Sequence, residues 1–382
     1  MIMTTLQVQS KKGPFAADQV GSLLRPQALK AARQQYKEGV ISREQLRQIE
    51  NEEIEKIVRK QKDVGLKAIT DGEFRRSWWH LDFLENLVGV EGYEANAGYH
   101  FSGKTTSSHQ VRVTGKIDFS DEHPFLVDFD FLNKLVGDSG DFIAKQTIPS
   151  PGMLGRYNYL DGSCYDDEAA YFHDLGQAYK KAIRAFYNHG CRYLQLDDTN
   201  WAYLCSQEKR EEIRKDGRDP DHLARLCAQA INAALEDKPE DLTVTMHICR
   251  GNFASSWIFS GGYEPVAEIL FGSVNVDGFF LEYDSERAGD FHPLRFVKRP
   301  DLKIVLGLIT SKFPELEAKA AIQERIEEAT KYVSLNQLAL SPQCGFASTE
   351  EGNILTEEDQ WNKLGLVVSI AEDIWNDAPA TE

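Results

Sequence analysis

The hydrophobic positions of this chain form short apolar runs that alternate with long amphipathic segments. One such segment, residues 165–190, has apolar residues at three- and four-residue spacing, acidic residues near its start and a glycine at its end, which is typical of a helix. Alternation of apolar runs with helices indicates βα units and a parallel sheet. The runs that we expect to be strands are residues 15–24, 66–74, 142–150, 193–199, 242–250, 278–284, 302–309 and 338–346. Strands in this number predict an α/β chain folded as a (β/α)8 barrel, or TIM barrel.

Two segments are longer than a minimal barrel requires. Residues 27–65 are charged and predict an N-terminal helical extension, and residues 80–125 form an insertion that contains the alternating run HQVRVTGKIDF. We interpret that run as a β-hairpin with Gly115 near its turn. No repeat or long linker divides the chain, so we expect a single domain over residues 1–382. A doubly wound sheet is the alternative, but no Gly-rich phosphate loop follows any predicted strand.

The net charge of the 382-residue chain is −17, from 43 basic and 60 acidic residues. Such a surface repels phosphate backbones and anionic lipids, so we expect no nucleic acid and no membrane as partners. No apolar run reaches the roughly 18 residues that span a bilayer, and the N-terminus lacks the apolar core of a secretory signal. Six cysteines without a paired spacing indicate a reducing compartment, which we take to be the cytoplasm.

Most of the predicted strands end on side chains that can do chemistry, and in a barrel these strand ends build the active site. His247 and Cys249 lie two residues apart on one strand, so their side chains face the same side. Glu282 and Cys344 end two later strands. Zinc accepts imidazole, thiolate and carboxylate ligands, and two thiolates favour it over magnesium or calcium. These four residues predict a Zn²⁺ site, whereas the His-x-Cys pair alone is better explained as a core cysteine beside a satisfied histidine.

Other strand ends carry acidic and aromatic residues. Glu73 follows the second strand, and Asp197 and Asp198 end the fourth. Because neighbouring side chains on a strand point to opposite sides, Asp198 is equally well explained as a helix N-cap. Four cysteines in or beside helical segments are interpreted as packing residues: Cys164, Cys191, Cys205 and Cys227. Four aromatic residues are interpreted as rim packing more readily than as a donor site: Trp78, Trp79, Trp201 and Tyr203.

Several motifs resemble the catalytic half of cobalamin-independent methionine synthase, and most closely its short, single-barrel relatives. The motifs are VGSLLRP (20–26), TDGEFRR (70–76), LQLDD (194–198), TMHICRGN (245–252), FFLEYD (279–284) and SPQCGF (341–346). The resemblance implies a catalytic zinc with four ligands, which are His247, Cys249, Glu282 and Cys344. It also implies that homocysteine is held through its amino and carboxylate groups by Gly21, Ser22, Glu73 and Asp197. A zwitterionic amino acid does need anions for its ammonium and donors for its carboxylate.

The implied activity is transfer of a methyl group to the thiol of homocysteine, with homocysteine and a methyl donor as small-molecule partners. Lys312 stands where the long enzymes have a histidine that protonates the folate leaving group. The pterin-stacking tryptophan and the duplicated N-terminal barrel of those enzymes have no counterpart here. We therefore expect poor use of methyltetrahydrofolate and a smaller or activated donor, such as a sulfonium or a methylated corrinoid. Lys312 is the candidate catalytic proton donor.

Other functions and the oligomeric state stay open at this point. Related barrels open epoxides with the thiol coenzyme M, although an acidic pocket suits an amino acid better than a sulfonate. A decarboxylase of the porphyrin type shares the barrel but needs no metal. A zinc-binding module without activity would close its site with four protein ligands, whereas a catalytic site exchanges one. For the assembly, a homodimer is one option.

Overall fold

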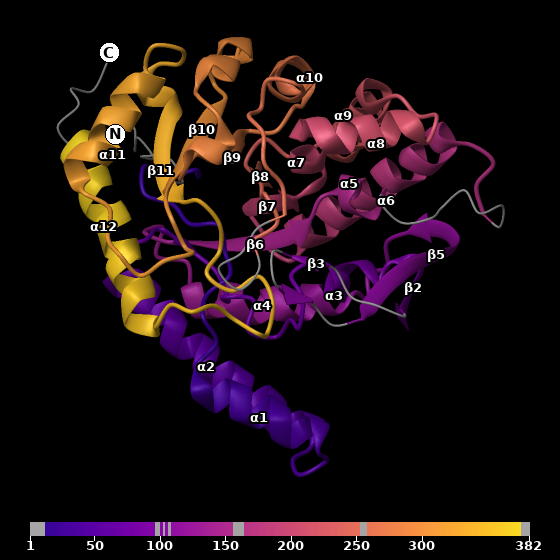
Figure 1. Ribbon diagram of the computed structural model, residues 1–382. Coiled ribbons are helices and arrows are strands. Elements are labelled where there is room, and N and C mark those ends of the chain that lie inside the picture. The colour runs from indigo at the N-terminus through magenta and orange to yellow at the C-terminus, as the bar shows by residue number, and fades with distance from the viewer. Residues whose placement is uncertain are drawn as a thin grey trace, which may run out of the picture.

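The computed structural model describes residues 12–95, 100–101, 104–105, 108–155, 164–252 and 258–375. The N-terminal segment in which we expect no secretory signal lies largely outside these residues. The described residues form a curled, seven-stranded parallel sheet in the order β1-β6-β7-β8-β9-β10-β11 (Figure 1). Its strands are β1 (Ala68–Ile69), β6 (Ile143–Pro149), β7 (Tyr193–Asp198), β8 (Thr243–Ile248), β9 (Gly278–Glu282), β10 (Lys303–Ile309) and β11 (Leu338–Pro342). Each of them falls inside a predicted strand, so the α/β class and the parallel sheet agree with the sequence.

The first predicted strand, residues 15–24, is not a regular strand. It makes one parallel bridge, between Ala17 and Leu340 of β11. Two hydrogen bonds support the bridge, from the Asp18 N–H to the Leu340 oxygen (3.0 Å) and from the Leu340 N–H to the Ala16 oxygen (2.8 Å). Beyond it, Gly21 has a φ of +150°, so the chain leaves the strand direction. The segment therefore lies beside β11 without becoming an eighth strand among the described residues.

A buried ion pair joins this N-terminal segment to the sheet. The Lys145 Nζ lies 3.1 Å from the Asp18 Oδ1, and both side chains are completely buried. The Tyr193 hydroxyl also donates to Asp18 (2.9 Å). Because Lys145 is on β6 and Tyr193 on β7, the segment before Gly21 is tied to two strands across the sheet.

The amphipathic segments form helices on the outside of the curled sheet (Figure 1). The longer ones are α4 (Pro124–Val136), α6 (Glu168–Asn188), α9 (Pro220–Leu235), α11 (Lys319–Ala329) and α12 (Glu357–Trp375). The shorter ones are α3 (Leu81–Leu84), α5 (Pro151–Leu154), α7 (Asn200–Cys205), α8 (Gln207–Lys215) and α10 (Ala267–Ser273), with 3-10 turns at Glu286–Ala288, His292–Phe296 and Leu335–Gln337. Helix α6 begins at a cap in which Asp167 accepts from the Ala170 N–H. Not one of the helices in the described ranges is long and apolar enough to cross a membrane.

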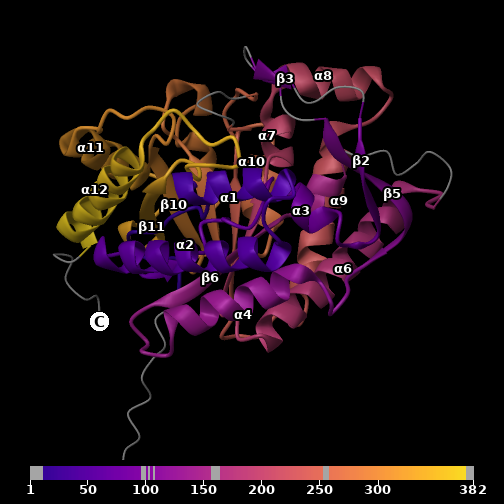
Figure 2. The ribbon, with the colours of Figure 1, turned by 90° about the horizontal axis from the view of Figure 1, so that it is seen from below.

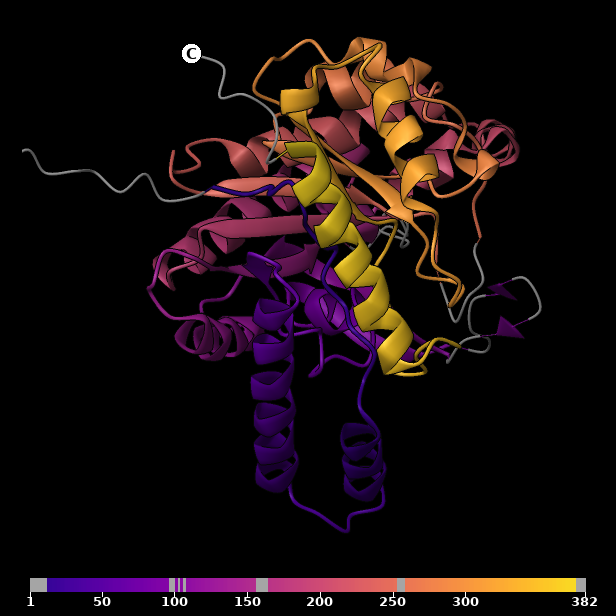
Figure 3. The same cartoon turned by 90° about the vertical axis from the view of Figure 1, so that its left-hand side faces the viewer.

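The predicted helical extension is a pair of helices, α1 (Gln27–Lys37) and α2 (Arg43–Asp63). They project from the body side by side (Figure 3), and α2 lies next to α4 when the molecule is seen from below (Figure 2). The break between them includes Gly39 at a φ of +72°. Ser42 then begins α2 with a capping box, in which its side chain accepts from the Gln45 N–H and the Gln45 side chain accepts from the Ser42 N–H.

The insertion contains an antiparallel pair of strands, but the predicted turn at Gly115 is wrong. Gly115 lies inside β5 (His109–Asp118), which pairs with β2 (Val88–Glu94), and a second short pair joins β3 (His100–Phe101) to β4 (Lys104–Thr105). A Cβ on Gly89 would lie 2.4 Å from the Lys116 oxygen, and one on Gly115 would lie 3.4 Å from the Gly89 Cα. The glycines therefore permit a close approach between two strands rather than a turn.

Candidate metal and substrate site

A pocket lies at the carboxyl ends of the strands and gathers most of the predicted site residues. Its walls are Val20, Ser22, Glu73, Trp79, Asp197, His247, Cys249, Cys344, Gly345 and Ser348. They come from the N-terminal segment, the loop after β1, the ends of β7 and β8, and the loop after β11. Gly21, Glu282 and Lys312 are not among the walls of this pocket. Residues far apart in the sequence meet here because parallel strands bring their carboxyl ends to one edge of the sheet.

The predicted metal ligands lie close together: three of them line the pocket, and Glu282 lies beside them. The ligand atoms of His247, Glu282 and Cys344 all lie within 4.8 Å of one another, and all three residues are buried. The Cys249 Sγ is 3.5 Å from the Cys344 Sγ. The Glu282 Oε1 accepts from the Arg250 N–H (2.8 Å), whereas its buried Oε2 accepts no hydrogen bond within the described structure. A carboxylate oxygen left without a hydrogen bond beside two sulfurs and an imidazole suits a zinc ion.

The two cysteines share their protons unequally. The hydrogen bond from the Cys344 thiol lowers the pKa of Cys249. The same bond, together with burial, raises the pKa of Cys344 well above its ordinary value. The Cys249 thiol therefore loses its proton more easily than the Cys344 thiol, and the thiolate is the form that binds metals.

His247 is oriented by Asp197. Its Nδ1 lies 3.2 Å from the Asp197 Oδ1, and its Nε2 lies 3.2 Å from the backbone oxygen of Gln343. Burial alone would lower the pKa of His247, but the hydrogen bond to Asp197 and the negative charges of Cys249 and Glu282 raise it to about 9. A carboxylate on one ring nitrogen is the usual support for a histidine that binds a metal through the other.

Glu73 is held in an unusual backbone conformation beside these residues. It has a φ of +60°, which is uncommon for a residue with a side chain. Its Oε1 accepts from the Thr147 hydroxyl (2.9 Å) and lies 3.2 Å from an Arg76 nitrogen. Its Oε2 is buried and has no hydrogen-bond partner in the described part of the chain. Burial raises the pKa of Glu73 to about 7, against the opposing charge of Arg76.

Gly21 and Ser22 sit where only small groups fit. A Cβ on Gly21 would lie 2.6 Å from the Thr147 Cγ2, and one on Gly345 would lie 2.0 Å from the Ser22 Oγ. The Ser22 Oγ accepts from the Ala347 N–H (3.3 Å). The N-terminal segment is thus packed directly on the loop that carries Cys344.

The remaining predicted residues lie differently. Asp198 accepts from the Ser150 hydroxyl and from the Trp201 N–H (2.7 Å) in the first turn of α7. Its carboxylate therefore caps the start of that helix, which is the alternative to a binding role. Lys312 pairs with Asp284 at 2.7 Å, and both side chains are at least 96 % buried. Among the aromatic residues, Trp79 lines the pocket, while Trp78 and Trp201 are buried.

Three residues that contact predicted site residues are not predicted from the sequence: Arg76 and Thr147, which contact Glu73, and Asp284, which pairs with Lys312. Arg76 and Asp284 belong to the motifs TDGEFRR and FFLEYD. Thr147 carries no such signal, because a threonine in a strand is ordinary.

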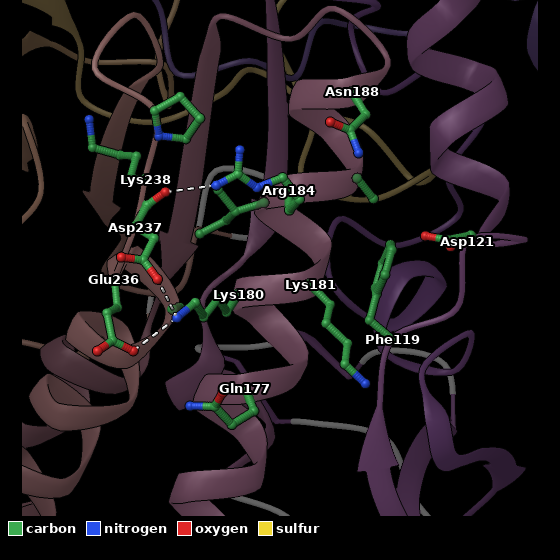
Figure 4. Close-up of a pocket in the computed structure, with 14 residues that line it drawn as sticks. Phe119, Asp121, Gln177, Lys180, Lys181, Arg184, Asn188, Glu236, Asp237 and Lys238 are labelled. Carbon is green, nitrogen blue, oxygen red and sulfur yellow. Dashed lines mark hydrogen bonds and ion pairs between the residues drawn. The ribbon is translucent and has the colours of Figure 1, made fainter.

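A second hollow lies on the outside, between α6 and the end of α9 (Figure 4). Its cations are already paired. Lys180 lies 2.9 Å from Glu236 and 3.0 Å from Asp237, Lys181 bonds Asp118, and Arg184 donates to the Asp237 oxygen. This hollow is near the amino end of β8 (Thr243–Ile248), and it does not contain the residues predicted for the site.

Comparisons with known proteins agree with this fold and show the family of the chain. Residues 15–104 and 144–372 match the family described as "Cobalamin-independent synthase, Catalytic domain". The chain therefore belongs to this family, and it is a methionine synthase-like methyltransferase.

Among its relatives, the chain is 56% identical to the uncharacterized protein YxjH of Bacillus subtilis (strain 168), over 96% of both chains. It is similar to the solved structure of a putative vitamin-B12 independent methionine synthase from Listeria monocytogenes. The TM-score is 0.77, with 52% identity over 96% of this chain and 99% of that one. A B12-independent methionine synthase from Shewanella sp. W3-18-1 shares the fold, with a TM-score of 0.68 and 17% identity over 96% of this chain and 99% of that one.

Proposed function

We propose that this protein moves a methyl group to the thiol of homocysteine, with a zinc ion held by four ligands, which are His247, Cys249, Glu282 and Cys344. The observation that carries the proposal is that two groups of side chains lie next to each other. Two cysteine sulfurs lie 3.5 Å apart beside an imidazole and the Glu282 carboxylate. Two further carboxylates, Glu73 and Asp197, line the pocket that the cysteines and the imidazole also line.

Zinc fits this donor set better than a hard cation does. Two sulfurs, one imidazole and one carboxylate are ligands that zinc accepts together. When bound, zinc lowers the pKa of a substrate thiol, so that a nucleophilic thiolate exists at neutral pH. The protein supplies the orientation of the ligands, through Asp197 on the imidazole ring and the Arg250 N–H on Glu282.

The amino-acid end of the substrate is bound by the protein alone. The buried Oε2 of Glu73 has no hydrogen-bond partner in the described structure, which supports a role in accepting an N–H of the substrate ammonium. Thr147 and Arg76 hold the other oxygen, Oε1, in place. Asp197 supplies a second negative charge on the same pocket wall. These carboxylates would repel a sulfonate, which argues against a coenzyme M-like thiol.

The methyl donor is the least constrained part of the proposal. A folate nitrogen must be protonated to leave, but the ammonium of Lys312 is tied to Asp284 and is not on the pocket wall. We therefore favour a donor that needs no general acid, such as a sulfonium or a methylated corrinoid.

For the fold, residues 15–24 beside β11 would complete the barrel as its eighth member, in a single domain over residues 1–382.

The test is to incubate the purified protein with homocysteine and a panel of donors, and to detect methionine by mass spectrometry. The panel contains methyltetrahydrofolate, its polyglutamate, methylcobalamin and a methylsulfonium. We expect methionine from at least one donor and the lowest turnover with the folates. If the folates are by far the best donors and Lys312→Ala abolishes only the reaction with folates, then Lys312 is the acid that protonates the leaving nitrogen. No methionine from any donor would refute the proposed activity.

The metal assignment has its own test. Cys249→Ser and Cys344→Ser should each lose most of the bound zinc, which we expect at about one ion per chain, because structural and catalytic zinc sites need their thiolate ligands. Metal analysis and circular dichroism measure occupancy and folding. Cys164→Ser, a half-buried thiol outside the pocket, is the control and should retain zinc. Full occupancy in both ligand variants would show that the ligands are wrong.

A further inference from the structure

Arg25 lies between two loops of the pocket without lining it. It belongs to the motif VGSLLRP (20–26) that carries Gly21 and Ser22, and only 3% of it is exposed. Such a buried cation needs hydrogen-bond partners, and within the described structure its two terminal nitrogens have them while its Nε does not. Its partners show which parts of the molecule it holds together.

The guanidinium of Arg25 donates to four backbone oxygens on two loops. Its Nη1 donates to the oxygens of Ala347 (3.0 Å) and Thr349 (2.9 Å), in the loop after Cys344. Its Nη2 donates to the oxygens of Glu73 (3.0 Å) and Arg76 (2.9 Å), in the loop after β1. One side chain therefore joins the loop that carries Glu73 to the loop that carries Cys344.

The same two loops also bond each other directly beside Arg25. The Trp79 N–H donates to the Ser348 oxygen (3.1 Å), and the Glu350 N–H donates to the Ser77 oxygen (2.9 Å). These bonds flank an antiparallel bridge between Trp78 and Thr349. A second guanidinium, that of Arg33, also joins the loops, since it donates to the Phe74 oxygen (2.7 Å) and to the Glu350 carboxylate (3.2 Å). Arg25 differs from Arg33 in donating to two backbone oxygens of each loop.

We propose that Arg25 is a positioning residue that sets the distance between Glu73 and Cys344. In consequence, it would couple the amino-acid end of the substrate to its sulfur end, and this consequence rests on the proposed function. Burial lowers the pKa of Arg25 to about 10, so the side chain remains charged at neutral pH. Its planar fork reaches both loops at once, which the single nitrogen of a lysine does not do.

Hydrogen exchange of the purified protein tests the clamp independently of any activity. In Arg25→Met, the backbone amides of Trp79 and Glu350 should exchange at least about tenfold faster, because hydrogen bonds from a charged donor are lost. Arg25→Lys should restore little of this protection. The control is Arg210→Met, because Arg210 is 6% exposed, donates to the Leu204 oxygen and pairs with Asp221, away from both loops.

Two exchange results would overturn the clamp. One is unchanged exchange at both amides in Arg25→Met. The other is a uniform increase over the whole chain of the kind that a loss of global stability produces, matched by Arg210→Met.

Kinetics test the coupling between the two ends of the substrate. In a wild-type protein that makes methionine, Arg25→Met should lower kcat/KM for homocysteine at least about tenfold. Arg210→Met should remain within about twofold of the wild-type value, as expected for a change distant from the site. Unchanged kcat and KM in Arg25→Met, together with faster loop exchange, would overturn the coupling. A wild-type protein without transfer activity would refute the proposed function instead, while the exchange result would still decide the clamp.

Discussion

At the scale of single residues, Glu73 shows how the fold prepares a charge for a ligand. Its left-handed backbone aims the carboxylate into the pocket, and only one of its oxygens is satisfied by Thr147 and Arg76. A buried acceptor without a donor is costly, so a ligand that supplies an N–H would relieve that cost. The uncommon backbone and the unpaired oxygen occur in one residue, which supports a binding role for Glu73.

Glu73→Gln should weaken homocysteine binding by about 2–5 kcal/mol at pH 8, since the substrate ammonium loses a desolvated partner. Zinc content should not change, because Glu73 is not one of the proposed ligands. Calorimetry with the zinc-loaded protein measures the affinity. Asp197→Asn should act in the same direction, and equal affinity in wild type and both variants would show that the ammonium binds elsewhere.

The raised pKa of Glu73, about 7, predicts a pH dependence of binding. Below pH 7 the carboxyl is mostly protonated in the protein without ligand, and an incoming ammonium favours the charged form, so binding releases a proton. Methionine is the better ligand for this test, because it has no thiol whose own proton could be released on binding. Its affinity should rise with pH up to about 7 and then level off. Calorimetry in two buffers of different ionisation enthalpy counts the proton, and Glu73→Gln should abolish its release near pH 6.5.

At the scale of elements, the pocket depends on close approaches between loops rather than on strand geometry alone. The N-terminal segment contacts the loop after β11, where Ser22 packs on Gly345. The Phe346 N–H donates to the Ser22 oxygen (2.9 Å), and the Leu23 N–H donates to the Gly72 oxygen (3.0 Å). A change of one methyl group at this contact would displace the loop that carries Cys344.

Gly345→Ala should destabilise the protein by about 1–3 kcal/mol, the usual cost of overpacking, and should reduce zinc occupancy. The reason is that the added Cβ would lie 2.0 Å from the Ser22 Oγ. Gly272→Ala is the matched control, because no atom lies within 4 Å of its added Cβ and alanine favours the helix. Thermal unfolding and metal analysis compare the two variants. Normal zinc binding in Gly345→Ala would mean that the loop tolerates the displacement.

At the scale of the whole molecule, a charged pair in the interior fixes the N-terminal segment to the sheet. Asp18 meets Lys145 and the Tyr193 hydroxyl with no exposed surface on either partner of the ion pair. A buried pair adds little net stability, but the loss of one partner leaves an uncompensated charge. We therefore expect the pair to act mainly by holding the segment that leads to Gly21 and Ser22 in register.

Lys145→Met should cost about 3–5 kcal/mol in the free energy of unfolding, since Asp18 is left buried without its cation. The double variant Lys145→Met with Asp18→Asn should be more stable than the sum of the two single changes predicts. Urea unfolding at pH 7 measures all three. A cost below about 1 kcal/mol for Lys145→Met would mean that Asp18 is relieved by another group.

Much of this protein could be predicted from its sequence. The strands of the parallel sheet lie within the ranges predicted from the apolar runs, because the order of apolar and polar residues in a segment depends on which of its faces is buried. Chemical type at the strand ends singled out His247, Cys249, Glu282 and Cys344. Parallel strands bring their carboxyl ends together, so these residues were expected to lie close to one another, as they do.

Only the tertiary structure decided how the loops meet. The sequence predicts a turn at Gly115, but this glycine lies inside β5 and permits a close approach to β2. The sequence predicts a strand over residues 15–24, but these residues form one bridge to β11 and then turn toward the loops that carry Glu73 and Cys344. Arg25 and Asp284 belong to motifs that the sequence shows, but neither the two loops that Arg25 joins nor the pairing of Asp284 with Lys312 could be predicted from them. These features depend on contacts between residues far apart in the chain, and a sequence pattern records how an element is buried, not which distant atoms it meets.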